Sequence, residues 1–329
     1  MAHSSGSGPT MRPSVNGTPE ASLSGEFAFL ERLRQALPEP PDGQVGVGDD
    51  TAVLGGGLLF ATDVLTEGIH FDLRWSTPAD VGWKALAVNL SDVAAMGGTP
   101  RAAVCGVVLG AGRKGEADDL AAGLMAAAAE LGCPLVGGDT TVGAVLTVTV
   151  AVIGDSPDGG AVLRSGARPG DSVFVTGPLG GSRAALGALR RGDNADPVAL
   201  ARLRRPVPRL VEGATAAAAG ASAMIDLSDG LSSDLAHICR ASGVGARLEA
   251  SAIPVGPGAA VDDALSGGDD YELCFTAPDP VRVAEAFAAA GLHLPAPIGT
   301  VTAGDEVLLA TPGGGTWPLA PSGWEHSVE

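Results

Sequence analysis

Aromatic residues and lysine are scarce in this 329-residue chain, and both shortages limit what the protein can be. Aromatic residues make up 4% of the sequence, so its hydrophobic cores must be built from alanine, valine and leucine. Lys84 and Lys114 are the only lysines, so arginine must supply nearly all the positive charge near any phosphate group. The formal net charge of −18 would repel nucleic acid and an anionic membrane surface. We therefore expect neither as a partner.

Cysteine and long apolar runs are also lacking. The four cysteines, Cys105, Cys133, Cys239 and Cys274, are far apart and lie in apolar patterns without Cys-x-x-Cys spacing, so we expect small buried hydrophobic residues. The five histidines have no zinc-site spacing. No apolar run approaches the roughly 20 residues of a membrane span, and the N-terminus is polar, unlike a signal sequence. These features predict no membrane association and a cytoplasmic location.

The length predicts two domains, because a typical domain has roughly 150 residues. Residues 1–24, rich in serine, glycine and proline, predict a disordered leader. Strand and helix patterns alternate through both halves, which predicts two α/β domains of the α+β sandwich type. We place the N-terminal domain at residues 25–157 and the C-terminal domain, with a mixed sheet plus helices, at residues 158–329. Residues 155–171, dense in glycine, proline and aspartate, would connect them.

The predicted elements follow from apolar spacing and from turn residues. In the N-terminal half they are helices at 27–37, 77–96 and 116–131 and strands at 58–64, 102–109, 134–136 and 146–153. In the C-terminal half they are strands at 172–176, 223–227, 245–249 and near 297 and 307, with helices at 181–191, 207–219, 231–240 and 281–290. Thr77 is the expected N-cap of its helix, with Asp80 three residues later.

Two carboxylates and a hydroxyl lie together at one strand-to-helix junction. Asp226 is expected at the carboxyl end of strand 223–227, and Asp229 is expected to cap the following helix by accepting an amide hydrogen bond. A cap needs only one acid. A second acid, together with Ser228, therefore suggests oxygen ligands for a divalent cation such as Mg²⁺.

Aspartate outnumbers glutamate by 24 to 14 and collects at glycine-rich segments that we place after strands. The positions are Asp49 and Asp50, Asp63, Asp139, Asp226 and Asp229, and Asp269 and Asp270. Any one of them could be an ordinary turn or cap residue. Because α/β folds bind ligands at the carboxyl ends of strands, so many clusters favour one shared site for a metal bound to phosphate groups.

A dinucleotide-binding site is the main rival among phosphate motifs. There is no P-loop and no kinase His-Arg-Asp catalytic loop, but residues 110–115 match Gly-x-Gly-x-x-Gly between a predicted strand and helix. That strand is not near the start of its domain. The interpretation would also leave Asp50, Asp63, Asp92 and Asp226 unexplained, so we favour the metal site.

Eight motifs, in order along the chain from Gly25 to about Trp324, together closely resemble thiamine-monophosphate kinases. They occupy residues 46–50, 61–63, 68–71, 84–97, 137–141, 164–167, 225–230 and 265–273. Single motifs are shared with a wider superfamily that includes aminoimidazole ribonucleotide synthetase, selenophosphate synthetase and the hydrogenase-maturation carbamoyl dehydratase. The more specific part is Asp-Leu-Ser-Asp-Gly at 226–230 together with Gly-Gly-Asp-Asp-Tyr-Glu-Leu at 267–273.

The resemblance implies a homodimer in which the N-terminal domains pair their sheets. It implies that ATP and several Mg²⁺ ions are held between the two domains, with residues 25–157 as the ATP- and Mg²⁺-binding domain. The implied reaction transfers the γ-phosphoryl group of ATP onto thiamine monophosphate, giving thiamine diphosphate and ADP.

The resemblance also implies a role for each matching residue. The implied metal ligands are Asp50, Thr62, Asp63, Asp92, Asp139, Asp226 and Asp229. The implied ATP contacts are Gly138, Asp139, Arg164 and Ser228, and the implied thiamine phosphate contacts are His70, Asp269 and Trp324. Asp226, Asp229 and Arg164 are the implied catalytic residues.

Two positions depart from the family pattern. Ala61 stands where relatives often have serine, and Asp269 replaces a common glutamate, which shortens its reach by one methylene. Two alternatives stay open. The chain could be another member of the superfamily that uses ATP on a different acceptor, like selenophosphate synthetase or aminoimidazole ribonucleotide synthetase. It could also be a non-catalytic sensor of a nucleotide or of thiamine.

Overall fold

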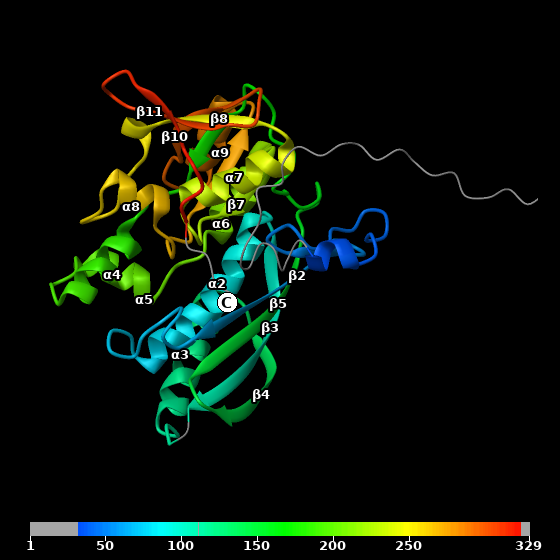
Figure 1. Cartoon of the computed structure of the whole chain (residues 1–329). Coiled ribbons are helices and arrows are strands. Elements are labelled where there is room, and N and C mark those ends of the chain that lie inside the picture. The colour runs from blue at the N-terminus through cyan, green and yellow to red at the C-terminus, as the bar shows by residue number, and fades with distance from the viewer. Residues whose placement is uncertain (1–31, 111, 324–329) are drawn as a thin grey trace, which may run out of the picture. The chain divides into compact units, whose positions relative to one another are not determined.

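This computed structural model describes residues 32–110 and 112–323. They form two β-sheets, each with its own helices (Figure 1). Both sheets belong to one compact unit, residues 38–324. Residues 32–36 are helical, as predicted, whereas the rest of that predicted helix before residue 32, the predicted leader at 1–24 and Trp324 lie outside the described residues. Among the described residues, no helix is long and apolar enough to span a membrane.

The N-terminal sheet has five strands in the order β1-β2-β5-β3-β4, and only its β3–β4 pair is parallel. The strands are β1 (Ala52–Leu54), β2 (Leu58–Thr66), β3 (Thr99–Gly110), β4 (Leu135–Gly143) and β5 (Thr147–Asp155). Helices α2 (Pro78–Ala95) and α3 (Glu116–Glu130) accompany it. Leu59, Ala61 and Leu65 of β2 are buried in the core that α2 shares, whereas the alternate residues Phe60 and Val64 are exposed on the other face.

Helix α2 begins as predicted and lies against both halves of the chain. The Thr77 hydroxyl accepts from the Asp80 amide and the Asp80 carboxylate accepts from the Thr77 amide, which confirms the capping box. At its other end α2 packs against α6 (Leu210–Ala219) of the C-terminal half. A Cβ on Gly213 would lie 2.1 Å from the Ala94 carbonyl oxygen, so this close helix contact requires glycine.

The C-terminal sheet has seven strands in the order β12-β11-β8-β10-β6-β9-β7, with β8 and β11 parallel and the other neighbours antiparallel. The strands are β6 (Ser172–Val175), β7 (Ala223–Asp226), β8 (Gly245–Glu249), β9 (Leu273–Ala277), β10 (Ala296–Thr302), β11 (Val307–Ala310) and β12 (Thr316–Pro318). The other helices are α4 (Gly181–Arg191), α5 (Pro197–Arg204), α7 (Leu231–Ser242), α8 (Val261–Ser266) and α9 (Pro280–Ala289), with a 3₁₀ turn, η1 (Ala250–Ala252). This confirms the mixed sheet with helices, although the short helices α5 and α8 were not predicted from the sequence.

The expectation that aspartates follow strands was wrong for most of them. Asp63 and Asp139 lie inside β2 and β4, while Asp49–Asp50 and Asp269–Asp270 precede β1 and β9. Only Asp226 is at the end of a strand, with Asp229 just beyond it. The four cysteines are buried free thiols, as expected.

Candidate active site

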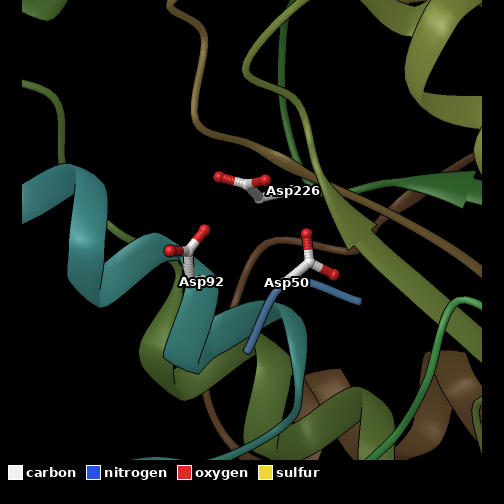
Figure 2. A group of neighbouring side chains, drawn as sticks. All are labelled: Asp50, Asp92 and Asp226. Carbon is white, nitrogen blue, oxygen red and sulfur yellow. The ribbon is translucent and has the colours of Figure 1, made fainter. Parts of the chain in front are cut away.

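Three carboxylates from distant parts of the chain converge beside the C-terminal part of α2. Asp50 precedes β1, Asp92 lies near the end of α2, and Asp226 is the last residue of β7. Each offers a carboxylate oxygen that lies within 4.8 Å of the other two (Figure 2). We call Asp50, Asp92 and Asp226 the carboxylate triad.

Short hydrogen bonds from α2 hold the strands that carry the acids. The Ser91 hydroxyl donates to Asp226 Oδ2 over 2.6 Å, which joins α2 directly to β7. The Asn89 side-chain oxygen accepts from the Asp63 backbone amide over 2.9 Å, which fixes β2 against the same helix. Asp63 is close enough for its charge to act on both Asp92 and Asp226. Four of the predicted metal ligands therefore share one region.

Burial and mutual repulsion make these carboxylates reluctant to ionise. Withdrawal from solvent, followed by the charges of Asp63, Asp226 and Asp50, raises the pKa of Asp92 well above its usual range. Burial, followed by the charge of Asp50, raises the pKa of Asp226 to about 8, despite the Ser91 hydrogen bond and Arg164. A cation among the carboxylates would relieve this repulsion.

Arg164 is the positive group that the structure places beside the triad. Its guanidinium contacts both oxygens of Asp50, with Nη2 at 2.7 Å and Nε at 3.3 Å, and its backbone amide donates to the Asp49 carboxylate. Burial, followed by the charge of Asp50, still raises the pKa of Asp49 to about 7. One guanidinium therefore does not neutralise this group of acids, and a further cation would stabilise their ionised form.

The donor set fits Mg²⁺. Mg²⁺ prefers hard oxygen ligands and usually takes only a few carboxylates, with water or substrate phosphate completing its shell. The triad offers such oxygens, and the spacing within 4.8 Å lets one ion contact all three after small side-chain rotations. Thiol and imidazole groups, which favour softer metals, are absent from this acidic group.

The predicted capping role of Asp229 is wrong. The N-cap of α7 is Gly230, at φ +123°, which has no side chain to accept a cap hydrogen bond. Instead Asp234, inside the first turn and buried, accepts from the backbone amides of Asp229 and Gly230 over 3.2 and 3.0 Å. Asp234 thus holds the junction that carries Ser228 and Asp229. Its role was not predicted from the sequence, although an acid four residues after a glycine at a helix start is a readable signal.

Comparisons with known proteins assign this architecture. The AIR synthase related protein N-terminal domain matches residues 48–155, and the corresponding C-terminal domain matches residues 168–310. Thiamine-monophosphate kinase of Salmonella typhimurium is 41% identical over 289 residues, covering 82% of this chain and 88% of that protein. The Escherichia coli K12 enzyme is 39% identical over 322 residues, covering 92% and 98%. This chain belongs to the thiamine-monophosphate kinase family.

A solved structure agrees with the family assignment. The structure of AaThiL complexed with AMPPCP and TMP is 33% identical, with a TM-score of 0.81 and coverage of 92% of this chain and 97% of that one. Membership of the kinase family decides against the dinucleotide-binding interpretation of residues 110–115. That interpretation also needs an acid at the end of the next strand, whereas Asp139 lies inside β4.

Two residues that the kinase-family resemblance implies as ligands lie apart from the triad. In the sheet register, Asp63 lies opposite Val150, Val150 opposite Cys105, and Cys105 opposite Gly138. Asp139 is therefore about 14 Å from Asp63, three strand spacings away. By strand alternation Asp139 and Thr62 point to the face opposite α2, where the Thr62 hydroxyl donates to the Val150 carbonyl. Their ligand roles, and the ATP contact of Gly138, stay predictions.

Two of the residues implied to contact thiamine phosphate, His70 and Asp269, lie on two loops. His70 follows β2, and its Nδ1 accepts from the Thr66 amide over 3.0 Å. Asp269 lies before β9 and is paired with Lys84 of α2, whose ammonium also donates to the His70 carbonyl. The structure therefore joins these two loops through one lysine.

The pKa shift of Asp226 predicts how pH and Mg²⁺ act on stability. Below about pH 4 Asp226 is protonated in both states, but between about 4 and 8 only the folded state keeps the proton. Asp226 therefore lowers the free energy of unfolding more and more as the pH rises, and this effect levels off above about pH 8. We therefore expect chemical denaturation in EDTA to show a higher free energy of unfolding for Asp226→Asn than for wild type. This difference should grow as the pH rises from about 4 to about 8.

Mg²⁺ should reverse that order. At pH 8 millimolar Mg²⁺ should raise the free energy of unfolding of the wild type but not of Asp226→Asn, because only the wild type presents the complete triad. Equal Mg²⁺ effects on the two proteins would contradict a cation site at Asp226, and a stability difference independent of pH would contradict its raised pKa.

Proposed function

We propose that this chain transfers the γ-phosphoryl group of ATP to thiamine monophosphate, giving thiamine diphosphate and ADP. The observation that carries the proposal is the convergence of Asp50, Asp92 and Asp226 beside Arg164 in a member of the thiamine-monophosphate kinase family. The relative AaThiL, solved with AMPPCP and TMP, supports the choice of both substrates.

This phosphoryl transfer requires the protein to position the two reactants and to neutralise their charge. The acceptor is itself a phosphate monoester, with a second pKa near roughly 6, so it is mostly ionised at neutral pH and needs no general base. The obstacle is that two anionic groups must meet in line. A site of this kind must therefore neutralise charge and hold both reactants. Arg164 would supply one positive charge, and a cation bound by the carboxylates would supply the rest.

Each group of this chain then has a defined task. Asp50, Asp92 and Asp226, with Asp63 beside them, would hold Mg²⁺, and Asp229 is proposed as a further ligand. Bound Mg²⁺ would supply positive charge that offsets the repulsion between the two phosphate groups. Arg164 and Ser228 contact ATP, while His70, Asp269 and Trp324 contact thiamine monophosphate. Asp234 keeps the junction at Asp229 in place through its two amide hydrogen bonds.

A homodimer is part of the proposal. The face of the N-terminal sheet opposite α2 exposes Phe60, Val64 and Val104, which supports pairing with the same face of a second copy. Thr62 and Asp139 point to that same face, so pairing of the two sheets would place both residues in the proposed dimer interface. The buried free thiols suit a reducing compartment, and we propose the cytoplasm.

Incubation of the purified chain with ATP, Mg²⁺ and thiamine monophosphate tests the function. We expect thiamine diphosphate and ADP in equal amounts, detected by chromatography, and no product without Mg²⁺. Selenide and formylglycinamidine ribotide, offered in parallel, should not be consumed. Consumption of either in place of thiamine monophosphate would favour another activity of the superfamily. Binding of both substrates without any product would favour a sensor.

A further inference from the structure

Lys84 is a buried ammonium that touches both loops of the proposed acceptor site. Its side chain is 4% exposed, and Nζ lies 2.7 Å from Asp269 Oδ1 and 3.1 Å from the His70 carbonyl oxygen. Lysine is rarely buried unless it is paired, so Lys84 depends on Asp269 as its counter-charge. It comes from α2, the helix that also carries Ser91 and Asp92 of the carboxylate site.

The Asp269 loop has an unfavourable backbone conformation. Asp269 and Tyr271 have φ of 66° and 49°, and among the described residues no other non-glycine residue has a positive φ. Side chains disfavour this left-handed region, so surrounding contacts must hold it. The Asp269 amide donates to the Ser228 carbonyl and the Tyr271 amide to the Leu227 carbonyl, each over 2.9 Å. The loop is thus bonded directly to the segment that follows Asp226.

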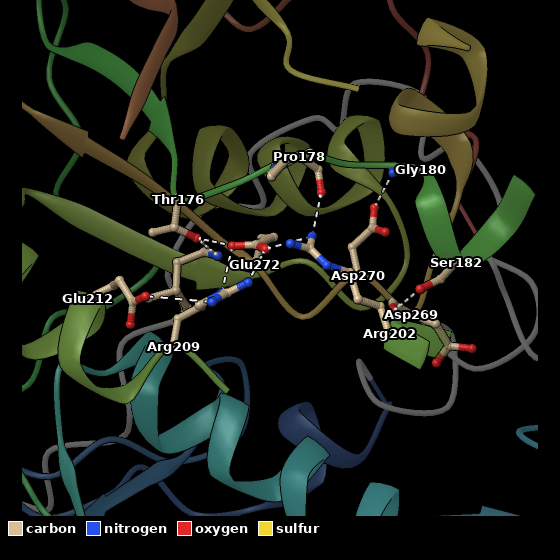
Figure 3. Close-up of polar contacts among 11 residues, drawn as sticks. Thr176, Pro178, Gly180, Ser182, Arg202, Arg209, Glu212, Asp269, Asp270 and Glu272 are labelled. Atoms are coloured by element: carbon tan, nitrogen blue, oxygen red, sulfur yellow. Dashed lines mark hydrogen bonds and ion pairs between the residues drawn. The ribbon is translucent and has the colours of Figure 1, made fainter. Parts of the chain in front are cut away.

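The alternate side chains of this loop are held within the C-terminal half. Asp270 accepts from the Gly180 amide over 2.6 Å, and buried Glu272 contacts Thr176, Arg202 and Arg209 (Figure 3). Asp269, in contrast, reaches the N-terminal half through Lys84. The loop therefore has a fixed base, and the Lys84 contact determines where the Asp269 carboxylate lies relative to His70.

The Asp269 carboxylate uses one oxygen for these contacts. Oδ1 forms the ion pair with the Lys84 ammonium and accepts a hydrogen bond from the Tyr271 hydroxyl over 3.1 Å. Oδ2 has no hydrogen-bond donor within the part of the chain that the structure describes, and the Asp269 side chain is 29% exposed. One oxygen is anchored and the other is available to a cationic ligand, which fits the positively charged thiazolium ring of the acceptor.

We propose that Lys84 is a positioning residue for the acceptor: it joins the His70 and Asp269 loops and anchors Asp269 Oδ1, so that Oδ2 meets the positive ring. The identity of the acceptor in this inference rests on the proposed function, whereas the contacts of Lys84 are given by the structure. The shortened acid at position 269 still reaches Lys84, over 2.7 Å.

Kinetics of Lys84→Met test the proposal, with Lys114→Met as the matched control. Methionine matches the length of the alkyl stem and removes the charge, and Lys114 is the only other lysine and is exposed. We expect the KM for thiamine monophosphate to rise about tenfold or more in Lys84→Met, with the KM for ATP within about twofold of wild type. Asp269→Asn should add little in the Lys84→Met background, because both changes break one contact. An unchanged acceptor KM, or equal changes in both KM values, would overturn the proposal.

Hydrogen–deuterium exchange separates this inference from the activity itself. Without substrates, Lys84→Met should speed exchange in residues 67–71 and 267–272 while leaving the β6–β9 strand pair unchanged. If Lys84→Met does not fold, Asp269→Asn should speed exchange in residues 67–71 instead. Unchanged exchange in these segments would overturn the role of Lys84. If the wild type forms no thiamine diphosphate, the proposed function fails, while the exchange result still decides whether Lys84 joins the loops.

Discussion

Replacing Asp226 by asparagine is expected to lower the rate of ADP formation about 10³-fold or more while leaving the fold intact. Asp226 belongs to the carboxylate triad and comes from the C-terminal half, so its replacement removes a charge that we propose holds the cation. Asparagine has the same shape and still offers an oxygen to the Ser91 hydroxyl. A coupled assay of ADP release measures the rate, and circular dichroism checks the fold.

Asp171→Asn is the matched control for this substitution. Asp171 is also 4% exposed, and its Oδ2 also accepts from a serine hydroxyl, that of Ser222, over 2.6 Å. It lies outside the acidic group, so its replacement should leave the rate within about twofold of wild type. Near-normal turnover by Asp226→Asn would remove Asp226 from the metal site, and equal losses in both variants would point to a structural effect.

Arg164→Met is expected to have the largest effect on stability, lowering the free energy of unfolding by about 3–5 kcal/mol at neutral pH without Mg²⁺. The Arg164 guanidinium contacts both oxygens of Asp50, whose side chain is fully buried, and Asp49 lies beside them. Methionine would leave buried acids without their cation. Urea denaturation measures the loss, and the KM for ATP should also rise, because Arg164 is a proposed ATP contact.

Arg168→Met provides the control for Arg164→Met, since it removes an exposed guanidinium from the same segment. It should change the free energy of unfolding by less than about 0.5 kcal/mol. Mg²⁺ should restore part of the stability that Arg164→Met loses, because an added cation takes over part of the neutralisation. A loss of less than about 1 kcal/mol in Arg164→Met would contradict the view that Arg164 balances Asp50.

Local sequence patterns predicted helices and strands correctly where the residues of a segment favour one structure only. The Thr77–Asp80 capping box and the strand ending at Asp226 are examples. The Gly137–Gly138–Asp139 segment was wrongly placed after the strand, because glycine is typical both of turns and of close strand packing. A Cβ on Gly138 would lie 2.1 Å from the Cys105 carbonyl oxygen, so glycine is needed there for close strand packing, and β4 continues through it.

The contacts that build the site could not be read from local patterns. Ser91 bonds Asp226 across 135 positions and Arg164 bonds Asp50 across 114, so neither pair leaves a periodic signal. Family resemblance nominated the acids, and the fold brings Asp50, Asp92 and Asp226 together. The contacts of Lys84 and Asp234 escaped both approaches, because each acts by holding a loop and not through a recognisable motif.

Direct titration with Mn²⁺, as a paramagnetic substitute for Mg²⁺, is the most direct test of the shared cation site. Electron paramagnetic resonance reports free Mn²⁺, so bound ion can be counted for wild type, Asp226→Asn and Asp171→Asn at the same pH. The convergence of Asp50, Asp92 and Asp226 predicts saturable binding to wild type and Asp171→Asn, with affinity at least about tenfold weaker in Asp226→Asn. Equal affinity in all three proteins would show that the cation does not bind among these carboxylates.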